Sequence, residues 1–227
     1  MKIECQNINK SYIEEKSFDK NNVLKEIDLQ ILAGETIALT GPSGSGKTTL
    51  LNIISGLDEP TSGNVLFDSK SMQKFDLNQR TKFRNHNLGV VFQFFNLLDD
   101  FSVYENIAMP LLIRGEKNKI IKEKVNILLD KIGLLKKINS NVTSLSGGES
   151  QRVAIARAMV GLPKLILADE PTGNLDKENT EKTINFLIDT CKKNSISLLM
   201  VTHDTELLNK FERVYLLESG NLKESTL

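Results

Sequence analysis

Residues 41–48, with the sequence GPSGSGKT, constrain the fold of this chain more than any other segment. They match the pattern G-x-x-x-x-G-K-[S/T] at every fixed position. In such a loop the glycines let successive backbone N–H groups point inward at phosphate oxygens, and the following helix adds its positive end. An apolar run, 36–40, precedes the loop, and a segment of helical character follows it to Ser55. A chance glycine-rich turn does not explain this placement, so the sequence predicts a strand, a phosphate-binding loop and a helix.

The residue types in this loop indicate their chemical roles. Lys47 can reach the β- and γ-phosphates of a nucleotide, and the Thr48 hydroxyl can ligate Mg²⁺. The predicted nucleotide-binding residues here are Gly41, Pro42, Ser43, Gly44, Ser45, Gly46, Lys47, Thr48 and Thr49.

The segment 165–170, LILADE, supplies the carboxylates that such a site needs. Four apolar residues indicate a buried strand, and two acids stand at its end. Ligands of open α/β sheets bind beyond the carboxyl ends of the strands, which would place Asp169 beside the phosphate-binding loop. Asp169 suits the metal and Glu170 the activation of water. The alternative is an acidic turn, because residues 170–173 also have good turn chemistry.

The order of the remaining patterns predicts the fold class. Apolar residues alternate with polar ones near the N-terminus, as in half-buried strands, with the charged stretch 14–22 as a hairpin loop. Residues 120–132 have the apolar spacing of an amphipathic helix. Strands and helices alternate after residue 164, including a helix from about Asp204, which indicates parallel βαβ units. We expect one α/β domain over 1–227, with a core of about 1–93 and 161–227 and a helical insertion at about 94–160.

A second candidate anion site begins at residues 145–149, LSGGE, ahead of a predicted helix. In isolation an ordinary Ser N-cap with a capping-box acid at Glu149 would explain it. After a phosphate-binding loop, and 20 residues before Asp169, it resembles the signature of the ABC ATPase family. The whole chain is similar to that family. The resemblance implies a P-loop NTPase (RecA-like) core with an N-terminal antiparallel β layer and an inserted helical subdomain.

Other residues match the family's motifs in order. Tyr12 stands where the family has an aromatic that stacks on adenine, and Gln93 where it has a glutamine that senses Mg²⁺ and the γ-phosphate. Residues 174–176 resemble the D-loop, which implies a dimer-interface role for Asp176. His203 resembles the switch histidine, although a lone His after a strand is usually a surface residue.

The resemblance also implies how the ATPase works. Two copies would close head to tail on two ATP molecules, each held between one chain's loop 41–48 and the other chain's signature, Ser146, Gly147, Gly148 and Glu149. Glu170 would polarise the attacking water, and His203 would hold the water and the γ-phosphate. Hydrolysis would then reopen the pair.

Several segments narrow the branch of the family. Residues 56–63, 88–93, 99–113 and 169–176 are similar to lipoprotein-releasing and macrolide- or peptide-exporting systems. We therefore expect an ATP-hydrolysing subunit that drives a separate membrane permease from the cytoplasmic face of the bacterial cell membrane. The alternatives are an ATPase switch of a cell-division or other non-transport complex, and a nucleotide-binding module without turnover. The presence of Glu170 and His203 argues against the last.

Five apolar residues follow Gln93 closely: Phe94, Phe95, Leu97, Leu98 and Phe101. Some of them could line a groove that grips a permease helix. Plain packing of the helical subdomain is an equally good interpretation.

Composition excludes several other classes. The 29 basic and 29 acidic residues cancel, which removes the basic footprint of sequence-independent nucleic-acid binding. No apolar run approaches the ~20 residues of a transmembrane helix, and the N-terminus lacks the apolar core of a secretion signal. Two distant cysteines, Cys5 and Cys191, do not form a disulfide framework or a zinc site. We expect a cytosolic chain that binds no nucleic acid.

Overall fold

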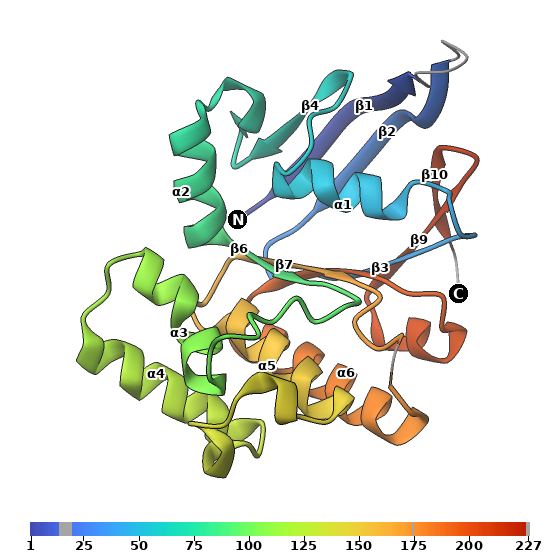
Figure 1. Cartoon of the computed structure of the whole chain (residues 1–227). Coiled ribbons are helices and arrows are strands. Elements are labelled where there is room, and N and C mark those ends of the chain that lie inside the picture. The colour runs from blue at the N-terminus through green and yellow to red at the C-terminus, as the bar shows by residue number, and fades with distance from the viewer. Residues whose placement is uncertain (14–19, 174, 226–227) are drawn as a thin grey trace.

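The computed structural model describes residues 1–13, 20–173 and 175–225, which form two β-sheets and several helices (Figure 1). The strands are β1 (Ile3–Ile13), β2 (Lys20–Ile31), β3 (Thr36–Thr40), β4 (Ser62–Phe67), β5 (Lys70–Ser71), β6 (Leu88–Val91), β7 (Leu165–Asp169), β8 (Ser197–Val201), β9 (Arg213–Glu218) and β10 (Asn221–Ser225). The α-helices are α1 (Lys47–Ser55), α2 (Leu77–Asn87), α3 (Val103–Ile113), α4 (Asn118–Lys131), α5 (Gly147–Met159) and α6 (Lys177–Lys193). Short 3₁₀ turns cover Met72–Lys74, Leu135–Lys137, Val142–Ser144 and Thr205–Lys210.

The central sheet has the strand order β10-β9-β3-β8-β7-β6. All neighbours from β9 to β6 pair in parallel, and only β10 is antiparallel. Both faces are buried: in β7, Leu165 and Leu167 join the hydrophobic core on one face, while Ile166 and Ala168 join the core on the other. Strands covered on both sides read as continuous apolar runs, as in the sequence here. The predicted parallel α/β fold is confirmed.

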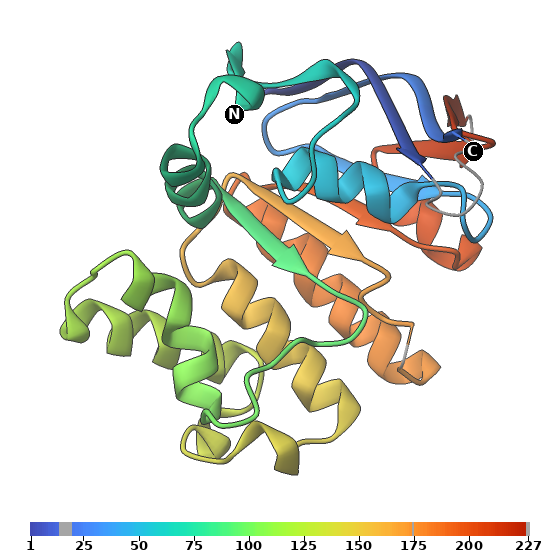
Figure 2. The same ribbon diagram turned by 45° about the horizontal axis from the view of Figure 1, so that its top comes forward.

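The second sheet, in the order β2-β1-β4-β5, is antiparallel throughout. It lies above the central sheet, with α1 between the two, as Figure 2 shows from a second angle. The apolar face of α1, including Leu50, Ile53 and Ile54, is fully or almost fully buried in the core that joins both sheets. This layer confirms the predicted N-terminal antiparallel β layer. It also fixes α1, and hence the loop that precedes it.

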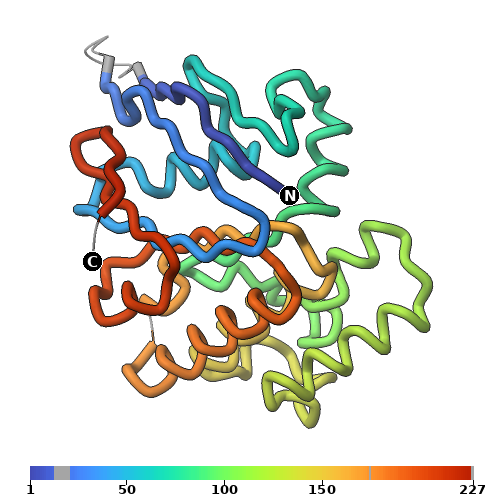
Figure 3. The backbone as a smooth tube through the Cα atoms, turned by 180° about the vertical axis from the view of Figure 1, so that it is seen from behind, coloured from blue at the N-terminus to red at the C-terminus, as the bar shows by residue number. Residues whose placement is uncertain are grey.

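The other face of the central sheet is covered by α5 and α6, seen from behind in Figure 3. A third hydrophobic core joins α3, α4 and α5 beside this face. The helix α5 contributes to both cores: Ile155 and Met159 pack toward the sheet, whereas Val153 and Ala156 pack toward α3 and α4. The second half of α5 is therefore packed on both sides. In the described part of the chain, no helix combines the length and apolar character needed to cross a bilayer.

One local prediction is wrong, one falls mostly outside the described residues, and some elements were not predicted. The helix expected from about Asp204 is a 3₁₀ helix of six residues, Thr205–Lys210, because Phe211 must already enter the core ahead of β9. The expected hairpin loop 14–22 falls mostly outside the described residues, and β2 already begins at Lys20. Two elements, α2 and β10, have no apolar pattern and were not predicted.

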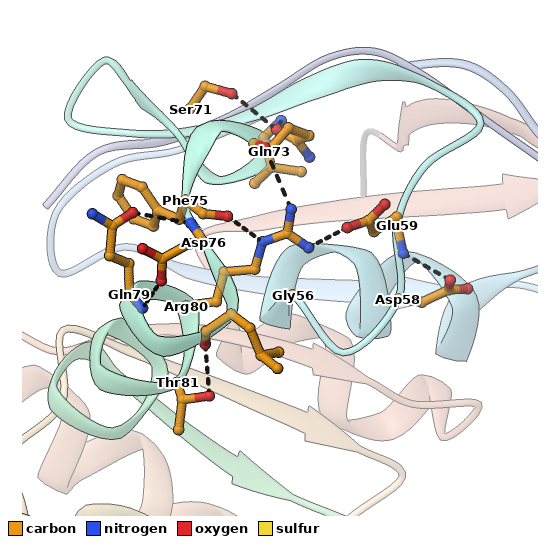
Figure 4. A network of polar contacts seen from close by, with 12 residues as sticks. Gly56, Asp58, Glu59, Ser71, Gln73, Phe75, Asp76, Gln79, Arg80 and Thr81 are labelled. Atoms are coloured by element: carbon orange, nitrogen blue, oxygen red, sulfur yellow. Dashed lines mark hydrogen bonds and ion pairs between the residues drawn. The ribbon is translucent and has the colours of Figure 1, made fainter.

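None of the residues of α2 is fully buried, and both polar contacts and one aromatic side chain hold the helix. Phe83 packs partly buried against the core, in contact with Phe67 of β4 and with Phe75. Asp76 caps its first turn by accepting a hydrogen bond from the Gln79 N–H, and Gln79 closes the capping box in return. The Arg80 guanidinium pairs with Glu59 and donates to the carbonyl oxygens of Phe75 and Gln73 at 3.0 and 3.3 Å (Figure 4). These bonds tie the helix to the segments on both sides of β4.

Candidate active site

The phosphate-binding loop leaves the central sheet at the end of β3 and enters α1. Gly41, Gly44 and Gly46 have φ values of 146°, 76° and 103°, which are strained for any residue with a side chain. At Gly41 the space is closed as well, because an added Cβ would lie 2.1 Å from the carbonyl oxygen of Leu217 in β9. The packing of the loop on the sheet edge therefore requires glycine at this motif position.

The loop presents a buried cation. Lys47 is only 7% exposed and donates hydrogen bonds to the carbonyl oxygens of Gly41 and Pro42 at 2.9 and 2.8 Å. The hydroxyl oxygen of Ser45 is buried and makes no hydrogen bond with any described residue. A buried polar atom without a partner is costly, and an anion in the loop would provide one. These features fit the phosphates of a nucleotide.

A hydrogen bond of 2.8 Å from the Thr48 hydroxyl to Asp169 joins the loop to the end of β7. Burial raises the pKa of the Asp169 carboxyl, and the neighbouring charge of Glu170 adds to this, while Thr48 and Lys47 act against it. A hydroxyl and a carboxylate in contact are the oxygen ligands that Mg²⁺ prefers. The pair fits the predicted metal position.

Glu170 follows in an unusual backbone conformation, with φ at 45° in the left-handed region. Its backbone N–H donates to the Val201 carbonyl oxygen at 3.1 Å, which holds this residue against the end of β8. His203 lies just beyond the same end, and its Nδ1 is 3.4 Å from a carboxylate oxygen of Glu170. Strained non-glycine residues concentrate at functional sites, so this geometry supports a catalytic interpretation of Glu170.

A cavity of about 540 Å³ joins part of the phosphate-binding loop with Gln93, Asp169 and Glu170. Its walls are Val23, Ser43, Gly44, Gly46, Lys47, Thr48, Thr49, Gln93, Asp169 and Glu170. A second cavity of about 520 Å³ shares Glu170 and contains His203. Gln93 lies close to both, because a Cβ on Gly173 would be 3.2 Å from its side-chain nitrogen. Residues from four separate segments thus converge on Glu170.

Tyr12 lies at the margin of this arrangement. It is 44% exposed, its hydroxyl donates to Asp58 at 2.8 Å, and the Lys10 ammonium lies 4.7 Å from its ring centre. Burial and the bond to Asp58 raise the pKa of Tyr12, while a contact with Thr49 lowers it. The ring therefore stands near the start of α1 but outside the walls of the cavity. Its role with adenine stays a prediction.

The signature residues 146–149 lie elsewhere, since none of them lines either cavity. Ser146 caps α5, whose first turn packs on α6: a Cβ on Gly148 would be 3.3 Å from the Asn179 side chain. Asn179 in turn donates to Asp176, the cap of α6, and these bonds lower the pKa of Asp176. The signature and the D-loop are thus neighbours within one chain. Asn174, the first D-loop residue, lies outside the described residues.

Sequence reasoning missed two residues that shape the cavity. Val23 in β2 lines it, and its Cγ1 would lie 2.9 Å from a Cβ on Gly46. Gly173 faces Gln93, as described above. The sequence around Val23 shows only the ordinary pattern of a strand, which does not point to a role in the site. Gly173 belongs to the turn 170–173, which the sequence did indicate.

The five apolar residues after Gln93, for which the sequence left a permease groove and plain packing open, are not all placed alike. Leu97 packs against the core of α3, α4 and α5, as the packing interpretation requires, whereas Phe94 is 71% exposed. An apolar groove of about 320 Å³ lies next to these five residues and none of them lines it. Its walls include Leu57, Phe92, Met109, Pro110, Ile113 and Arg157.

Comparisons with known proteins agree with this geometry. A family model described as ABC transporter matches residues 24–173. The ATP-binding protein LolD of the lipoprotein-releasing system of Saccharophagus degradans is 45% identical over 222 residues, 98% of this chain and 96% of the relative. LolD of Legionella pneumophila strain Lens is 46% identical over 88% of each chain. The ATP-binding cassette MJ0796, solved as a dimer in a post-hydrolysis state with ADP and Pi, superposes with a TM-score of 0.89 at 34% identity, covering 98% of both chains.

The raised pKa of Asp169 predicts that its charge destabilises the ligand-free protein. Asp169→Asn should raise the melting temperature at neutral pH by on the order of 2–4 °C, since an amide can still accept the Thr48 hydrogen bond. A raised folded pKa weakens stability as pH rises through it, so the gain should vanish under acidic conditions where the carboxyl is protonated in both states. Thermal denaturation across pH measures this. Asp130→Asn, at an exposed position of α4, is the control, and an equal gain there would contradict the prediction.

Proposed function

The chain belongs to the ABC transporter family, and we propose that its ATPase activity drives a separate membrane permease with which it forms a complex. The observation that carries this proposal is the convergence of the phosphate-binding loop, Gln93, Asp169 and Glu170 on one cavity, with His203 beside Glu170. This is a set of groups for binding a nucleoside triphosphate and activating water.

The cargo follows from the relatives. LolD proteins of two bacteria, about 45% identical to this chain, are named as parts of a lipoprotein-releasing system. We infer that this chain serves the release of lipoproteins, or the export of similar amphiphilic or antimicrobial compounds. The ATPase would then act at the cytoplasmic face of the bacterial inner membrane as a peripheral subunit.

We assign the following roles within the site. The loop 41–49 binds the phosphates, with Lys47 on the β- and γ-phosphates, and Tyr12 stacks on the adenine. Glu170 takes a proton from the attacking water, while His203 and Gln93 contact the γ-phosphate side. The 3.4 Å contact between Glu170 and His203 supports this division, because it places His203 beside Glu170, which lines the nucleotide cavity.

Mg²⁺ is the cofactor that this donor set fits. Thr48, Asp169 and Gln93 would hold it together with phosphate oxygens, and it would neutralise charge on the transferred phosphoryl group. The described residues contain no cluster of three or more His, Cys, Asp or Glu side chains that could hold a metal ion alone. This agrees with an ion that arrives with the nucleotide.

Two copies complete the proposed site. Ser146, Gly147, Gly148 and Glu149 do not line the cavity of their own chain, and the first turn of α5 offers unpaired N–H groups. We propose that they bind the ATP of a second copy in a head-to-tail dimer, with Asp176 at the interface. The related cassette MJ0796, solved as a dimer, supports this arrangement. Glu149 would contribute through the capping box that shapes this turn and not through its charge.

The apolar groove beside β6 is the proposed contact for the permease. It lies between the central sheet and α3, and Arg157 in its wall donates to the carbonyl oxygens of Phe95 and Asn96 at 2.9 and 2.6 Å. A permease helix seated there would contact Arg157, which is hydrogen-bonded to the segment that follows Gln93. We further propose that residues 94–160 form a helical subdomain that moves on the core of the single domain 1–227.

Replacing Glu170 with Gln tests the catalytic role. The variant should bind ATP as the parent does, because the amide keeps the shape of the side chain, but turnover should fall about 10²–10⁴-fold with the loss of a positioned base. ATP titration and phosphate release measure the two quantities. Glu178→Gln, an exposed position in α6, is the control. Unchanged turnover in Glu170→Gln would refute the assignment.

Replacing Lys47 tests the binding role. Lys47→Ala should raise the dissociation constant for ATP by about 10- to 100-fold, because charge-assisted hydrogen bonds to ground-state phosphates are lost. Lys47→Met retains the buried stem and should show the same loss, which separates charge from packing. Lys119→Ala on exposed α4 serves as control. An ATP affinity equal to the parent's in both Lys47 variants would disprove the role.

The permease is tested by capture from detergent-solubilised membranes of the source cells, with Glu170→Gln and ATP to hold the closed dimer. We expect to recover a membrane-spanning permease with a large extracytoplasmic domain, identified by mass spectrometry. Ile113→Glu, a charge in the apolar groove, should abolish its capture, while Ile127→Glu at a similarly exposed site on α4 should not. Recovery of soluble partners alone would overturn the transporter proposal and favour an ATPase switch.

A further inference from the structure

The start of α5 contains an ion pair that the predicted functions do not use. Lys137, in the 3₁₀ turn that follows α4, donates a hydrogen bond of 2.6 Å to one carboxylate oxygen of Glu149. The other carboxylate oxygen accepts the Ser146 N–H at 2.9 Å. Both oxygens of Glu149 are therefore engaged, and the carboxylate side chain is only 18% exposed.

The Glu149 carboxylate lies in the helix turn that is proposed to bind the phosphates of ATP, so its negative charge is unfavourable there. The Ser146 oxygen accepts the Glu149 N–H, which leaves its proton free to donate, and the N–H groups of Gly147 and Gly148 begin the helix. These donors face the phosphates of a second copy's ATP in the proposed dimer. A carboxylate in the same turn repels those phosphates and competes with them for the positive helix end.

We infer that Lys137 is a positioning residue for nucleotide binding in trans. It neutralises the Glu149 carboxylate and holds it away from the phosphates, so that the first turn of α5 can bind the triphosphate held by the partner subunit. This inference rests on the proposed head-to-tail dimer. It assigns a role to the helical segment that carries Lys137, which contributes no residue to either cavity around Glu170.

The charge state of the pair supports this role. The hydrogen bond from Lys137 is the first cause that holds the pKa of Glu149 below its usual range, followed by the Ser146 N–H. Glu149 is therefore ionised at neutral pH, and the need for a counter-charge persists. Lys136, one residue earlier and exposed, forms no ion pair with any described residue, so it provides a matched control.

The test uses full-length chains in the Glu170→Gln background and measures the ATP concentration at half-maximal dimer formation by light scattering. Lys137→Met should raise this concentration about three- to tenfold, the worth of a partly exposed charged pair. Lys137→Arg should retain the parent value. Adding Glu149→Gln to Lys137→Met should restore it to within about twofold, because glutamine still closes the capping box without the charge.

Two further measurements separate this role from a purely structural one. Binding of a fluorescent ATP analogue, at protein concentrations too low for dimers, should be unchanged in Lys137→Met, since the chain's own phosphate loop is intact. With Glu170 present, Lys137→Met should raise KM for ATP and leave kcat near the parent value, whereas Lys136→Met should change neither.

The outcomes are distinguishable. If the parent dimerises with ATP and Lys137→Met does so at the same ATP concentration, the inference is wrong while the proposed function stands. If Glu149→Gln fails to rescue Lys137→Met, Lys137 acts by packing and the inference is also wrong. If the Glu170→Gln parent does not dimerise with ATP, the proposed dimer itself fails and the role of Lys137 falls with it.

Discussion

The parallel pairing of β3, β7 and β8 places the carboxyl ends of three strands at one edge of the central sheet. The phosphate-binding loop leaves β3 there, Asp169 and Glu170 end β7, and His203 follows β8. The hydrogen bond between Thr48 and Asp169 and the contact between Glu170 and His203 both depend on this register. A shift of one residue in β7 would turn Asp169 to the other face, because side chains alternate along a strand. The site is therefore a consequence of how the core strands pair.

The same edge holds several features that are unfavourable without a ligand. Asp169 carries a charge that burial opposes, Glu170 has a left-handed backbone, and the Ser45 hydroxyl oxygen is buried without a partner. Each of these costs stability on its own. Phosphates and a cation bound at this edge would compensate the Asp169 charge and give the Ser45 oxygen a partner, so these features fit a site adapted to its liganded state. Selection for function explains why a more stable arrangement has not replaced them.

The sequence predicted those parts whose information is local. The strands 36–40 and 197–201 match the structure residue for residue, because a buried apolar run can be recognised without its distant partners. The helix α2 was missed because its residues show no apolar periodicity, and Arg80 and the packing of Phe83 on the core hold it in place. The contacts of Tyr12 with Asp58 and of Lys137 with Glu149 join segments that no periodicity relates. Such pairings follow from tertiary packing, so they required the structure.

The helix α5 connects the parts of the molecule that must respond to nucleotide. Its first turn carries the signature, and near its other end Arg157 donates to the carbonyl oxygens of Phe95 and Asn96, just after Gln93. Burial lowers the pKa of Arg157, so its guanidinium needs those two carbonyls, and a displacement of α5 would carry the segment after Gln93 with it. Gln93 lines the nucleotide cavity and Arg157 lines the apolar groove. The helix α5 carries Arg157 and the signature, and Arg157 binds the segment directly after Gln93, so α5 links both places to the signature. When the proposed dimer closes on ATP, a displacement of α5 would therefore move the wall of the apolar groove without any rearrangement inside the central sheet.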